Sequence, residues 1–445
     1  MNDLVRTGIL PAQTAGGPAR VEDSRELGPS ESLTSQAHLM GALMAGGILR
    51  VSGPLTPERV RRALDWLQDE HPILRAHIVR KGFRFIRDIP FVQPVLHFET
   101  RGTERIPLRV VTDPRPAAGA RLLQAELRQP IPLGPLPRIK AALVRPSDGA
   151  DTAEIVMCVD HTIADAQSAM FSMAQLLAFL GDPDGAPAPK GLFQPLPPAL
   201  DSVLPPKSDS GRPYQPMIRL PVERLPRGEI GTATERRTFT TAETETIRRR
   251  LRARRVTLHG LVTAAVLKGI NQRFTMPEMT VLSSVDLRRQ CRPAIPPDVY
   301  GCYIDVLRTR HAIDRPLWAL AQDVTYGLIT TLARDHRSAS ALRAPTWDML
   351  RAELIPLLRS GFRGDGLVIT TVGEIGLRRQ YGPFRLEAMA GMISQEVMGA
   401  GFFCMVLERE GELEFSLCYA AHRLAAADGR AVADIAAGLL RNLPN

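Results

Sequence analysis

The chain has 445 residues, of which 44% are hydrophobic, and a formal net charge of +9. Because single hydrophobic cores stop growing above roughly 250–300 residues, we expect two packed subdomains. No apolar run reaches the about 18 residues of a membrane-spanning helix. Residues 1–24 lack the continuous apolar segment of a signal peptide, so we expect a cytoplasmic protein without stable membrane insertion.

The positive charge does not by itself indicate a nucleic-acid-binding protein. Only five of the 56 basic residues are Lys, and aromatic residues make up 5% of the chain, so platforms for stacking bases are scarce. The five cysteines are odd in number and never form a C-x-x-C pair, which argues against a disulfide framework and a zinc ribbon. We expect neither nucleic acid nor metal as a partner, and the basic surface is suited to steering an acidic protein or a phosphate-bearing cofactor.

The first half of the chain alternates predicted helices and strands. Residues 1–24 are polar and aperiodic and are expected to be a loose leader. A helix is predicted from Thr56, which suits the N-cap, with Pro57 at the first helical position. The next elements are a strand near 71–79, a helix at 121–129, strands ending at 145 and 159, and a buried helix at 167–180. We assign residues 25–180 to an N-terminal subdomain.

The second half follows a predicted proline-rich crossover at residues 181–221, where eleven prolines exclude regular structure. The predicted elements after it are helices at 241–255 and 257–270, strands at 279–288 and 300–309, helices to about 360, a strand at 366–373, a hairpin at 401–423 and a helix at 429–443. We assign residues 222–445 to a C-terminal subdomain. The predicted fold class is α/β in two parts of similar size.

His161 and Asp165 form the only His-x-x-x-Asp pattern of the chain. His161 stands where a buried apolar strand is predicted to end, which is where open α/β sheets expose functional groups. The pattern is short enough to arise by chance, so a histidine that merely ends a strand stays an alternative. Ser168 lacks a G-x-S-x-G elbow, which argues against a serine hydrolase, and His259 lies in an apolar helical pattern typical of a hydrogen-bonded core histidine.

The segment "DHTIADAQS" (160–168) resembles the HHxxxDG motif of the condensation-domain and chloramphenicol-acetyltransferase-like acyltransferase superfamily. The segments "HPILRAHIV", "PLPRIKAALV", "VTLHGLVTAAVL", "DVYGCYIDVL" and "ITTVGEIG" resemble further family segments in the same order. "SSVDLRRQCRP" is similar to the "VDLR" strand of the phthiocerol/phthiodiolone dimycocerosyl transferase-like branch. The resemblance extends from about residue 25 to residue 445.

This resemblance implies two chloramphenicol-acetyltransferase-like subdomains in a V with an active-site tunnel between them. The donor thioester and the acceptor would enter from opposite faces and meet at His161. A neutral imidazole can take the proton of an alcohol at neutral pH and return it to the leaving thiolate. The resemblance further implies that Asp165 points away from the substrate and forms a structural ion pair with Arg288, the arginine of the "VDLR" match.

The sequence departs from the family pattern at three positions. Asp160 replaces the first His of the motif and is expected to change only the packing beside the base. Ala166 replaces the Gly and is expected to narrow acceptor access. Thr371 stands where relatives of this branch often have Asn; Thr370 or Thr371 could donate to the oxyanion, although ordinary strand residues are the favoured interpretation. With Gly301 of the "DVYGCYIDVL" segment, these residues are the candidates for lining the tunnel.

The resemblance implies an acyltransferase that moves a polyketide or fatty acyl chain from a carrier-protein or CoA thioester onto an alcohol to form an ester. An amide-forming condensation enzyme and a non-catalytic, condensation-like docking domain are the alternatives, and the intact His161 argues against the latter. No bound cofactor is expected, because the phosphopantetheine thioester or acyl-CoA is the donor substrate. The expected partners are an acyl carrier protein and a small-molecule alcohol, and the chain is compatible with a monomer.

Overall fold

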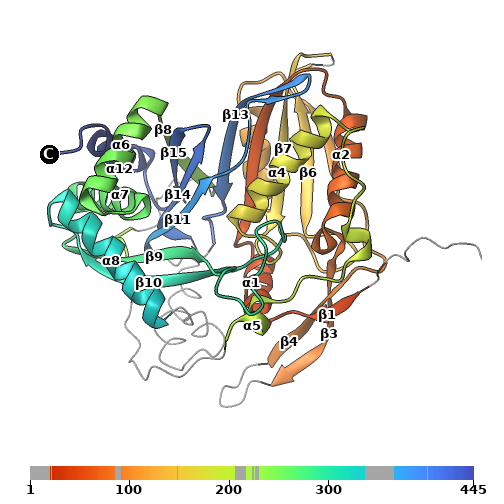
Figure 1. Cartoon of the computed structure of the whole chain (residues 1–445), viewed down its shortest axis with the longest axis horizontal. Helices are drawn as coiled ribbons and strands as arrows, with labels where there is room; N and C mark the ends of the chain where they lie inside the picture. Colours follow the sequence, from red (N-terminus) through yellow and green to blue (C-terminus); the bar gives the residue numbers. More distant parts are fainter. Residues whose placement is uncertain are drawn as a thin grey trace, which may run out of the picture.

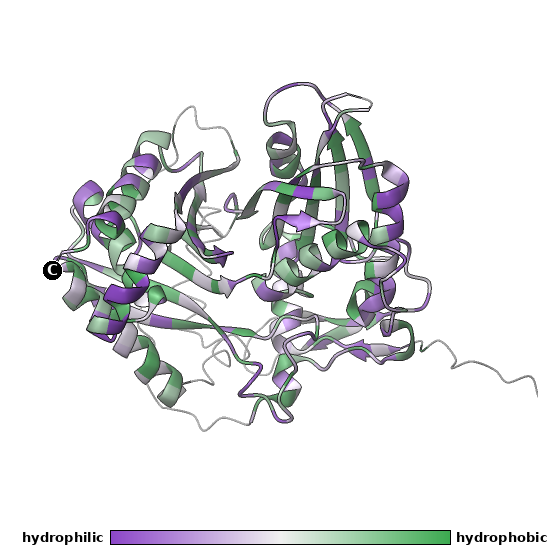
Figure 2. Cartoon of the chain, turned by 45° about the horizontal axis from the view of Figure 1, so that its top comes forward, coloured by the Kyte–Doolittle hydropathy of each residue, from purple (hydrophilic) through white to green (hydrophobic). Residues whose placement is uncertain are grey.

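The computed structural model describes residues 21, 23–85, 92–147, 149–205, 217–222, 225, 230–335, 365–397 and 399–444. These residues form two halves that lie side by side, each built on a six-stranded β-sheet (Figure 1). Coloured by hydropathy, the strands of the sheets are largely hydrophobic, whereas the helices mix hydrophobic and hydrophilic residues (Figure 2). The predicted α/β fold class in two parts is confirmed.

The sheet of the first half mixes strands from both ends of the chain. In spatial order it contains β12 (Gln380–Tyr381), β13 (Phe384–Ile393), β2 (Met44–Ser52), β7 (Thr152–Asp160), β6 (Ile139–Arg145) and β5 (Leu108–Thr112). Helices α2 (Pro57–Glu70) and α4 (Ala166–Gly181) bury their apolar residues against one face, and α3 (Ala118–Leu127) packs on the other. β7 is sandwiched between β2 and β6 and covered on both faces, which explains its uninterrupted apolar sequence.

A small three-stranded sheet extends the first half. Its strands are β1 (Ser24–Glu26), β4 (Val92–Glu99) and β3 (His77–Phe85), in that spatial order, and α1 (Pro29–Leu39) follows β1 along the chain. A single 3-10 turn, Pro72–Arg75, separates α2 from β3. The strand predicted near 71–79 therefore begins later than its sequence pattern indicates, because Pro72 opens the turn.

The second half is a mixed sheet with helices on the side away from the first half (Figure 1). Its strands, in spatial order, are β10 (Ile304–Ala312), β9 (Glu278–Asp286), β11 (Asp365–Glu374), β14 (Ala400–Arg409), β15 (Glu412–Ala420) and β8 (Thr232–Phe239). Its helices are α6 (Thr241–Arg254), α7 (Leu258–Phe274), α8 (Leu317–Asp335) and α12 (Ala426–Arg441), which share one hydrophobic core with the sheet. The hairpin predicted at 401–423 is the antiparallel pair β14–β15.

β12 and β13 correct the expected domain boundary. The sequence assigns all of residues 222–445 to the second subdomain, but β13 pairs with β2 in the first sheet, with Gly391 opposite Gly47. A strand's alternation of inward and outward side chains is the same in either sheet, so the pattern does not say which sheet a strand joins. By crossing between the halves, β13 becomes part of the wall between them.

The other expected boundaries are described only in part. The leader, residues 1–24, lies almost wholly outside the described residues, and Ser24 already belongs to β1. The described part of the crossover at 181–221 contains a one-turn helix, α5 (Leu200–Val203), where no regular structure is predicted. The helices predicted beyond α8 fall on residues 336–364, outside the described residues. Within the described chain, no helix is long and apolar enough to cross a bilayer.

Candidate active site

The candidate site begins where β7 ends. A turn at residues 161–165 follows β7, and Asp165 is the N-cap of helix α4. The Asp165 Oδ1 accepts a hydrogen bond from the Ser168 backbone N–H at 2.9 Å. An aspartate is a favoured N-cap because its carboxylate satisfies an N–H that the helix leaves unpaired. The turn is therefore fixed by a buried strand on one side and a capped helix on the other.

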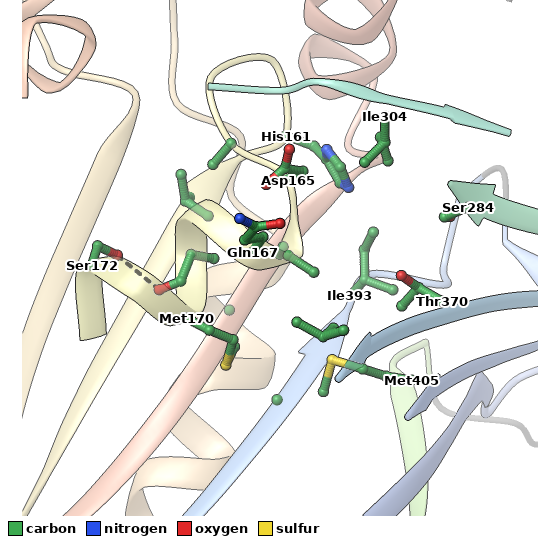
Figure 3. A pocket seen from close by; sticks show the side chains of 18 of the residues that line it. His161, Asp165, Gln167, Met170, Ser172, Ser284, Ile304, Thr370, Ile393 and Met405 are labelled. Atoms are coloured by element: carbon green, nitrogen blue, oxygen red, sulfur yellow. Dashed lines mark hydrogen bonds between the residues drawn. The ribbon is translucent and has the colours of Figure 1, made fainter. Parts of the chain in front are cut away.

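His161 lies at the boundary between the two halves. Its backbone N–H donates to the Leu43 carbonyl at 3.3 Å, and its Nδ1 lies 3.7 Å from the Sγ of Cys302, just before β10. Figure 3 shows the imidazole near Ile304 at one end of a cavity whose other end is occupied by Met170 and Met405. A ring held by its Nδ1 side has its Nε2 available for a substrate.

Asp165 and Arg288 form a buried ion pair across the two halves. Arg288 Nη1 lies 2.7 Å from Asp165 Oδ2, and both side chains are almost fully buried. Burial alone would lower the pKa of Arg288, but the Asp165 carboxylate holds that pKa above its ordinary value. Asp165 also accepts from the Tyr303 N–H at 3.0 Å, so its oxygens serve Arg288, Tyr303 and Ser168 rather than His161.

Gly301 lies behind this ion pair instead of lining the main cavity. Its carbonyl accepts from Ser168 Oγ at 2.8 Å, from the Asp165 N–H at 3.2 Å and from Arg288 Nη2 at 3.3 Å. Gly301 is therefore not among the residues that line this cavity, contrary to the expectation; together with Cys302 and Tyr303 it lines a second, smaller pocket. Its carbonyl is an anchor that fixes Cys302, the next residue, beside His161.

Asp160 is likewise absent from the cavity lining, contrary to the expectation. Side chains alternate along β7, so Asp160 points to the α3 face while Val159 points to the α4 face. Its carboxylate accepts from Arg138 Nη2 at 2.6 Å and from Thr162 Oγ1 at 2.7 Å, and all three side chains are buried. Burial opposes ionisation, but Arg138 holds the pKa of Asp160 below its ordinary value.

The cavity has a volume of about 260 Å³ and is mainly apolar. Ala166, Thr370 and Thr371 line it, as expected from the sequence. Five methionines contribute to its walls from four different elements: Met157, Met170, Met173, Met392 and Met405. Flexible, polarisable methionine side chains adapt to irregular apolar ligands.

His259 is a hydrogen-bonded core histidine in the structure. Its Nδ1 lies 3.0 Å from Thr371 Oγ1 and its Nε2 2.9 Å from Ser283 Oγ. Burial lowers its pKa to about 4, so the ring is neutral at physiological pH. The Thr371 hydroxyl is thereby engaged behind the cavity wall, which leaves Thr370, drawn in Figure 3, as the threonine whose hydroxyl is better placed for a ligand.

Three residues that contribute to the site are not predicted by the sequence. From the sequence, Ser168 is considered only as a nucleophile, although its position three residues after an aspartate is typical of a helix first turn. Cys302 and Tyr300 flank Gly301, and nothing in their local pattern distinguishes them from buried structural residues. Only the fold brings residues 300–303 against the turn that follows β7. Within the described residues, no group of His, Cys, Asp and Glu is placed to hold a metal ion.

Comparisons with known protein families and solved structures identify relatives of this chain. Residues 229–376 match the family model for the phthiocerol/phthiodiolone dimycocerosyl transferase C-terminus. No curated protein matches the chain by sequence. The matched segment contains Arg288, Cys302 and Thr370, which are among the second half's contributions to the site, whereas Phe403 and Met405 of β14 lie beyond it.

Solved structures resemble the chain over nearly its whole length. Trichothecene 15-O-acetyltransferase from Fusarium sporotrichioides is 12% identical with a TM-score of 0.70, covering 94% of each chain. Polyketide synthase associated protein 5 from Mycobacterium tuberculosis is 15% identical with a TM-score of 0.63, covering 96% of this chain and 99% of that one. The epimerization domain from the third module of tyrocidine synthetase B is 15% identical with a TM-score of 0.64, covering 96% and 97%. The chain thus has the fold of the condensation-domain and chloramphenicol-acetyltransferase-like superfamily, as its motifs indicate.

Proposed function

We propose that this chain is an acyltransferase that moves a polyketide or fatty acyl chain from a thioester onto an alcohol, with His161 as the general base. The observation that carries the proposal is the position of His161 at one end of an apolar cavity between the two halves. The match to a dimycocerosyl transferase model and the fold shared with a 15-O-acetyltransferase support ester formation. The first of these neighbours is named as an O-acetyltransferase, and polyketide synthase associated protein 5 is named for its association with a polyketide synthase.

The proposed reaction needs one proton to move twice. His161 Nε2 takes the proton of the acceptor hydroxyl while the hydroxyl oxygen bonds to the thioester carbonyl carbon. The tetrahedral oxyanion then collapses, the carbon–sulfur bond breaks, and the imidazolium returns the proton to the leaving thiolate. The products are an ester and a free thiol, so the step balances without a metal or redox group.

The ion pair at Asp165 holds the geometry for this step. Its partners come from α4, from the segment after β9 and from the segment before β10, so it fixes the turn bearing His161 against the second half. A buried bidentate-capable arginine is suited to such positioning because its planar group fixes orientation as well as charge. Asp165 and Arg288 are positioning residues in this proposal.

The cavity suits an acyl chain better than a charged ligand. Its methionines, together with Val159, Ile304 and Phe403, make most of the exposed lining apolar, although polar residues such as Gln167 and Thr370 also contribute to it. Burying a methylene is worth about 0.8 kcal/mol, so even a short chain gains appreciable binding free energy there.

An acyl carrier protein is the proposed donor, with acyl-CoA as the other candidate. The fold neighbours include the epimerization domain of a multi-module synthetase, and the chain's net charge of +9 would attract an acidic carrier. Either donor presents the same pantetheine thioester to the cavity, so the chemistry at His161 is the same for both.

A panel of acyl thioesters incubated with alcohols and amines, with products identified by mass spectrometry, tests the proposal. Ester products that disappear with His161→Ala support it. Amide products alone would identify the amide-forming alternative. An intact, folded protein that binds a carrier but yields no product from any pair would favour the docking-domain alternative.

A further inference from the structure

Buried ion pairs lie at both ends of the turn that bears His161. Asp165–Arg288 ties the end of the turn to the second half. Asp160–Arg138 precedes the turn within the first half, with Arg138 Nη2 2.6 Å from Asp160 Oδ2 and both side chains fully buried. Desolvation offsets much of the attraction within a buried pair, so such a pair specifies geometry more than it adds stability.

Asp160 folds the chain around His161 in an Asx turn. Its Oδ1 accepts from the Thr162 backbone N–H at 2.9 Å and from the Thr162 hydroxyl at 2.7 Å, and its backbone carbonyl accepts from the Ile163 N–H at 3.1 Å. An aspartate side chain that accepts from the N–H two residues later closes a turn of this kind. His161 is the residue that the turn encloses, so these bonds fix the backbone from which the imidazole projects.

Arg138 holds the Asp160 carboxylate in the orientation that the turn needs. Its Nε and Nη2 both donate to Asp160 Oδ2, at 2.9 and 2.6 Å, which leaves Oδ1 for Thr162. Its Nη1 donates to the carbonyls of Ile131 and Pro132, each at 2.8 Å. Charge-assisted bonds of a planar guanidinium fix direction as well as distance, so the segment before β6 anchors the turn that follows β7.

We propose that Asp160, Arg138 and Thr162 form a clamp that positions His161, and that the direction of the imidazole depends on the Thr162 hydroxyl. The inference rests on the proposed function, in which His161 is the base. Asp160, Arg138 and Thr162 are absent from the lining of the main cavity, whereas Asp165 and Arg288 belong to it. The clamp therefore acts on the reaction through the backbone of His161, and its three members are positioning residues.

Paired substitutions at Thr162 test the clamp. Thr162→Val keeps the shape of the side chain but removes the hydroxyl, whereas Thr162→Ser keeps the hydroxyl. We expect Thr162→Val to lower kcat roughly tenfold, because a slightly misplaced base loses rate without losing substrate affinity. KM should stay at the wild-type value, since Thr162 lies outside the cavity lining. Thr162→Ser should keep kcat close to that of the wild type.

Thr244→Val is the matched control. Thr244 is as buried as Thr162, and its hydroxyl accepts from the Leu413 N–H at 3.0 Å in the second half. Both valine variants should lower the Tm, because each removes a buried hydrogen bond, but only Thr162→Val should lower kcat. Equal losses of kcat in the two variants would mean that destabilisation alone explains the effect, and would overturn the clamp. A Thr162→Ser variant as slow as Thr162→Val would overturn it as well.

Amide hydrogen exchange separates this inference from the proposed function. Without substrate, exchange in the peptide that contains residues 161–165 should be roughly tenfold faster in Thr162→Val, because one hydrogen bond that closes the turn is lost. Thr162→Ser and Thr244→Val should exchange there like the wild type. If the wild type converts no thioester and alcohol, the proposed function fails, while faster exchange confined to Thr162→Val still supports the clamp. Unchanged exchange in Thr162→Val, or faster exchange with wild-type kcat, would overturn it.

Discussion

At the scale of single residues, Asp165 shows how one carboxylate organises the turn that bears His161. It caps α4, pairs with Arg288 and accepts the Tyr303 N–H, so three separate segments depend on it. The motif predicts the positions of His161 and Asp165, and the family resemblance predicts Arg288 as the partner of Asp165. The Asp160–Arg138 pair was not predicted, because a charged residue at a strand end gives no sign of which face it will occupy.

Breaking the Asp165–Arg288 pair should lower stability as well as activity. We expect Asp165→Asn and Arg288→Met each to cost about 3–5 kcal/mol of unfolding free energy, because each leaves one buried polar partner uncompensated. The double variant should cost clearly less than the sum of the two single variants.

Denaturant unfolding of all four proteins measures this coupling. The exposed pair Lys81–Glu99, at 2.6 Å, is the control and should show a coupling below about 1 kcal/mol. Additive effects at Asp165 and Arg288 would mean that the pair does not hold the turn.

His259 should make stability depend on pH. Its pKa is lowered from 6.5 to about 4, so the unfolded chain binds the proton more readily between these values, and stability is lost as the pH falls from 6.5 to 4. His259→Gln keeps a donor and an acceptor for Thr371 and Ser283 but does not titrate. We expect it to remove on the order of 3 kcal/mol of that loss.

Unfolding free energies at pH 7 and pH 4.5 measure the difference. His38, whose burial also lowers its pKa to about 4, should maintain part of the slope in the variant. A variant with the same slope as the wild type would show that His259 is not the titrating group.

At the scale of elements, β13 and β2 form a floor under the cavity. Gly391 and Gly47 are directly opposite in the paired strands. A Cβ at Gly391 would lie 2.8 Å from Met405 Cε, and one at Gly47 would lie 2.5 Å from Met173 Cε. The glycines thus leave room for two methionine tips, which together limit the depth of the cavity.

Gly391→Ala should shorten the acyl chain that the cavity accepts. The added methyl would displace the Met405 tip into the cavity, and each methylene that no longer fits costs roughly 10-fold or more in kcat/KM. Met405→Ala should shift the preference towards longer chains.

Competition between thioesters of graded length measures the shift. Gly438→Ala is the control, because a Cβ there meets nothing within 4 Å and the position lies in α12 of the other half. An unchanged length profile in Gly391→Ala would place the acyl chain elsewhere.

Elements differ in how well their sequences predict them. α2 begins at Pro57 after the Thr56 cap as predicted, and β9 and the β14–β15 hairpin also match their apolar patterns. These elements depend on local signals such as capping residues and alternation. The place of β13 in the first sheet depends on a pairing across more than 330 residues of chain, which no local signal encodes.

At the scale of the whole molecule, the cavity depends on contacts between the two halves. β13 joins the first sheet, and Arg288 reaches Asp165 from the second half. Motif order along the sequence was enough to predict two halves and a site between them. The lining was predicted only in part, because the side-chain direction at Asp160 and the backbone position of Gly301 follow from three-dimensional packing.

The net charge of +9 predicts a salt-dependent donor preference. For one acyl group, kcat/KM with an acidic carrier should exceed that with CoA at low salt, and the advantage should collapse as the Debye length falls from about 10 Å at 0.1 M to about 3 Å at 1 M. The rate with a short pantetheine thioester, which lacks both protein and nucleotide, is the control and should change little. CoA outperforming several acidic carriers at every salt concentration would identify a free-standing acyl-CoA enzyme.

The turnover of His161→Ala tests the central claim most directly. With a thioester and an alcohol that the wild type converts, we expect kcat to fall by about 10²–10⁴-fold, because the base acts in the transition state. The circular dichroism spectrum and Tm should stay close to those of the wild type, since the half-buried His161 ring contacts the Cys302 thiol and forms no ion pair with the residues that the structure describes. A folded His161→Ala protein with wild-type turnover would contradict the assignment of His161 as the general base.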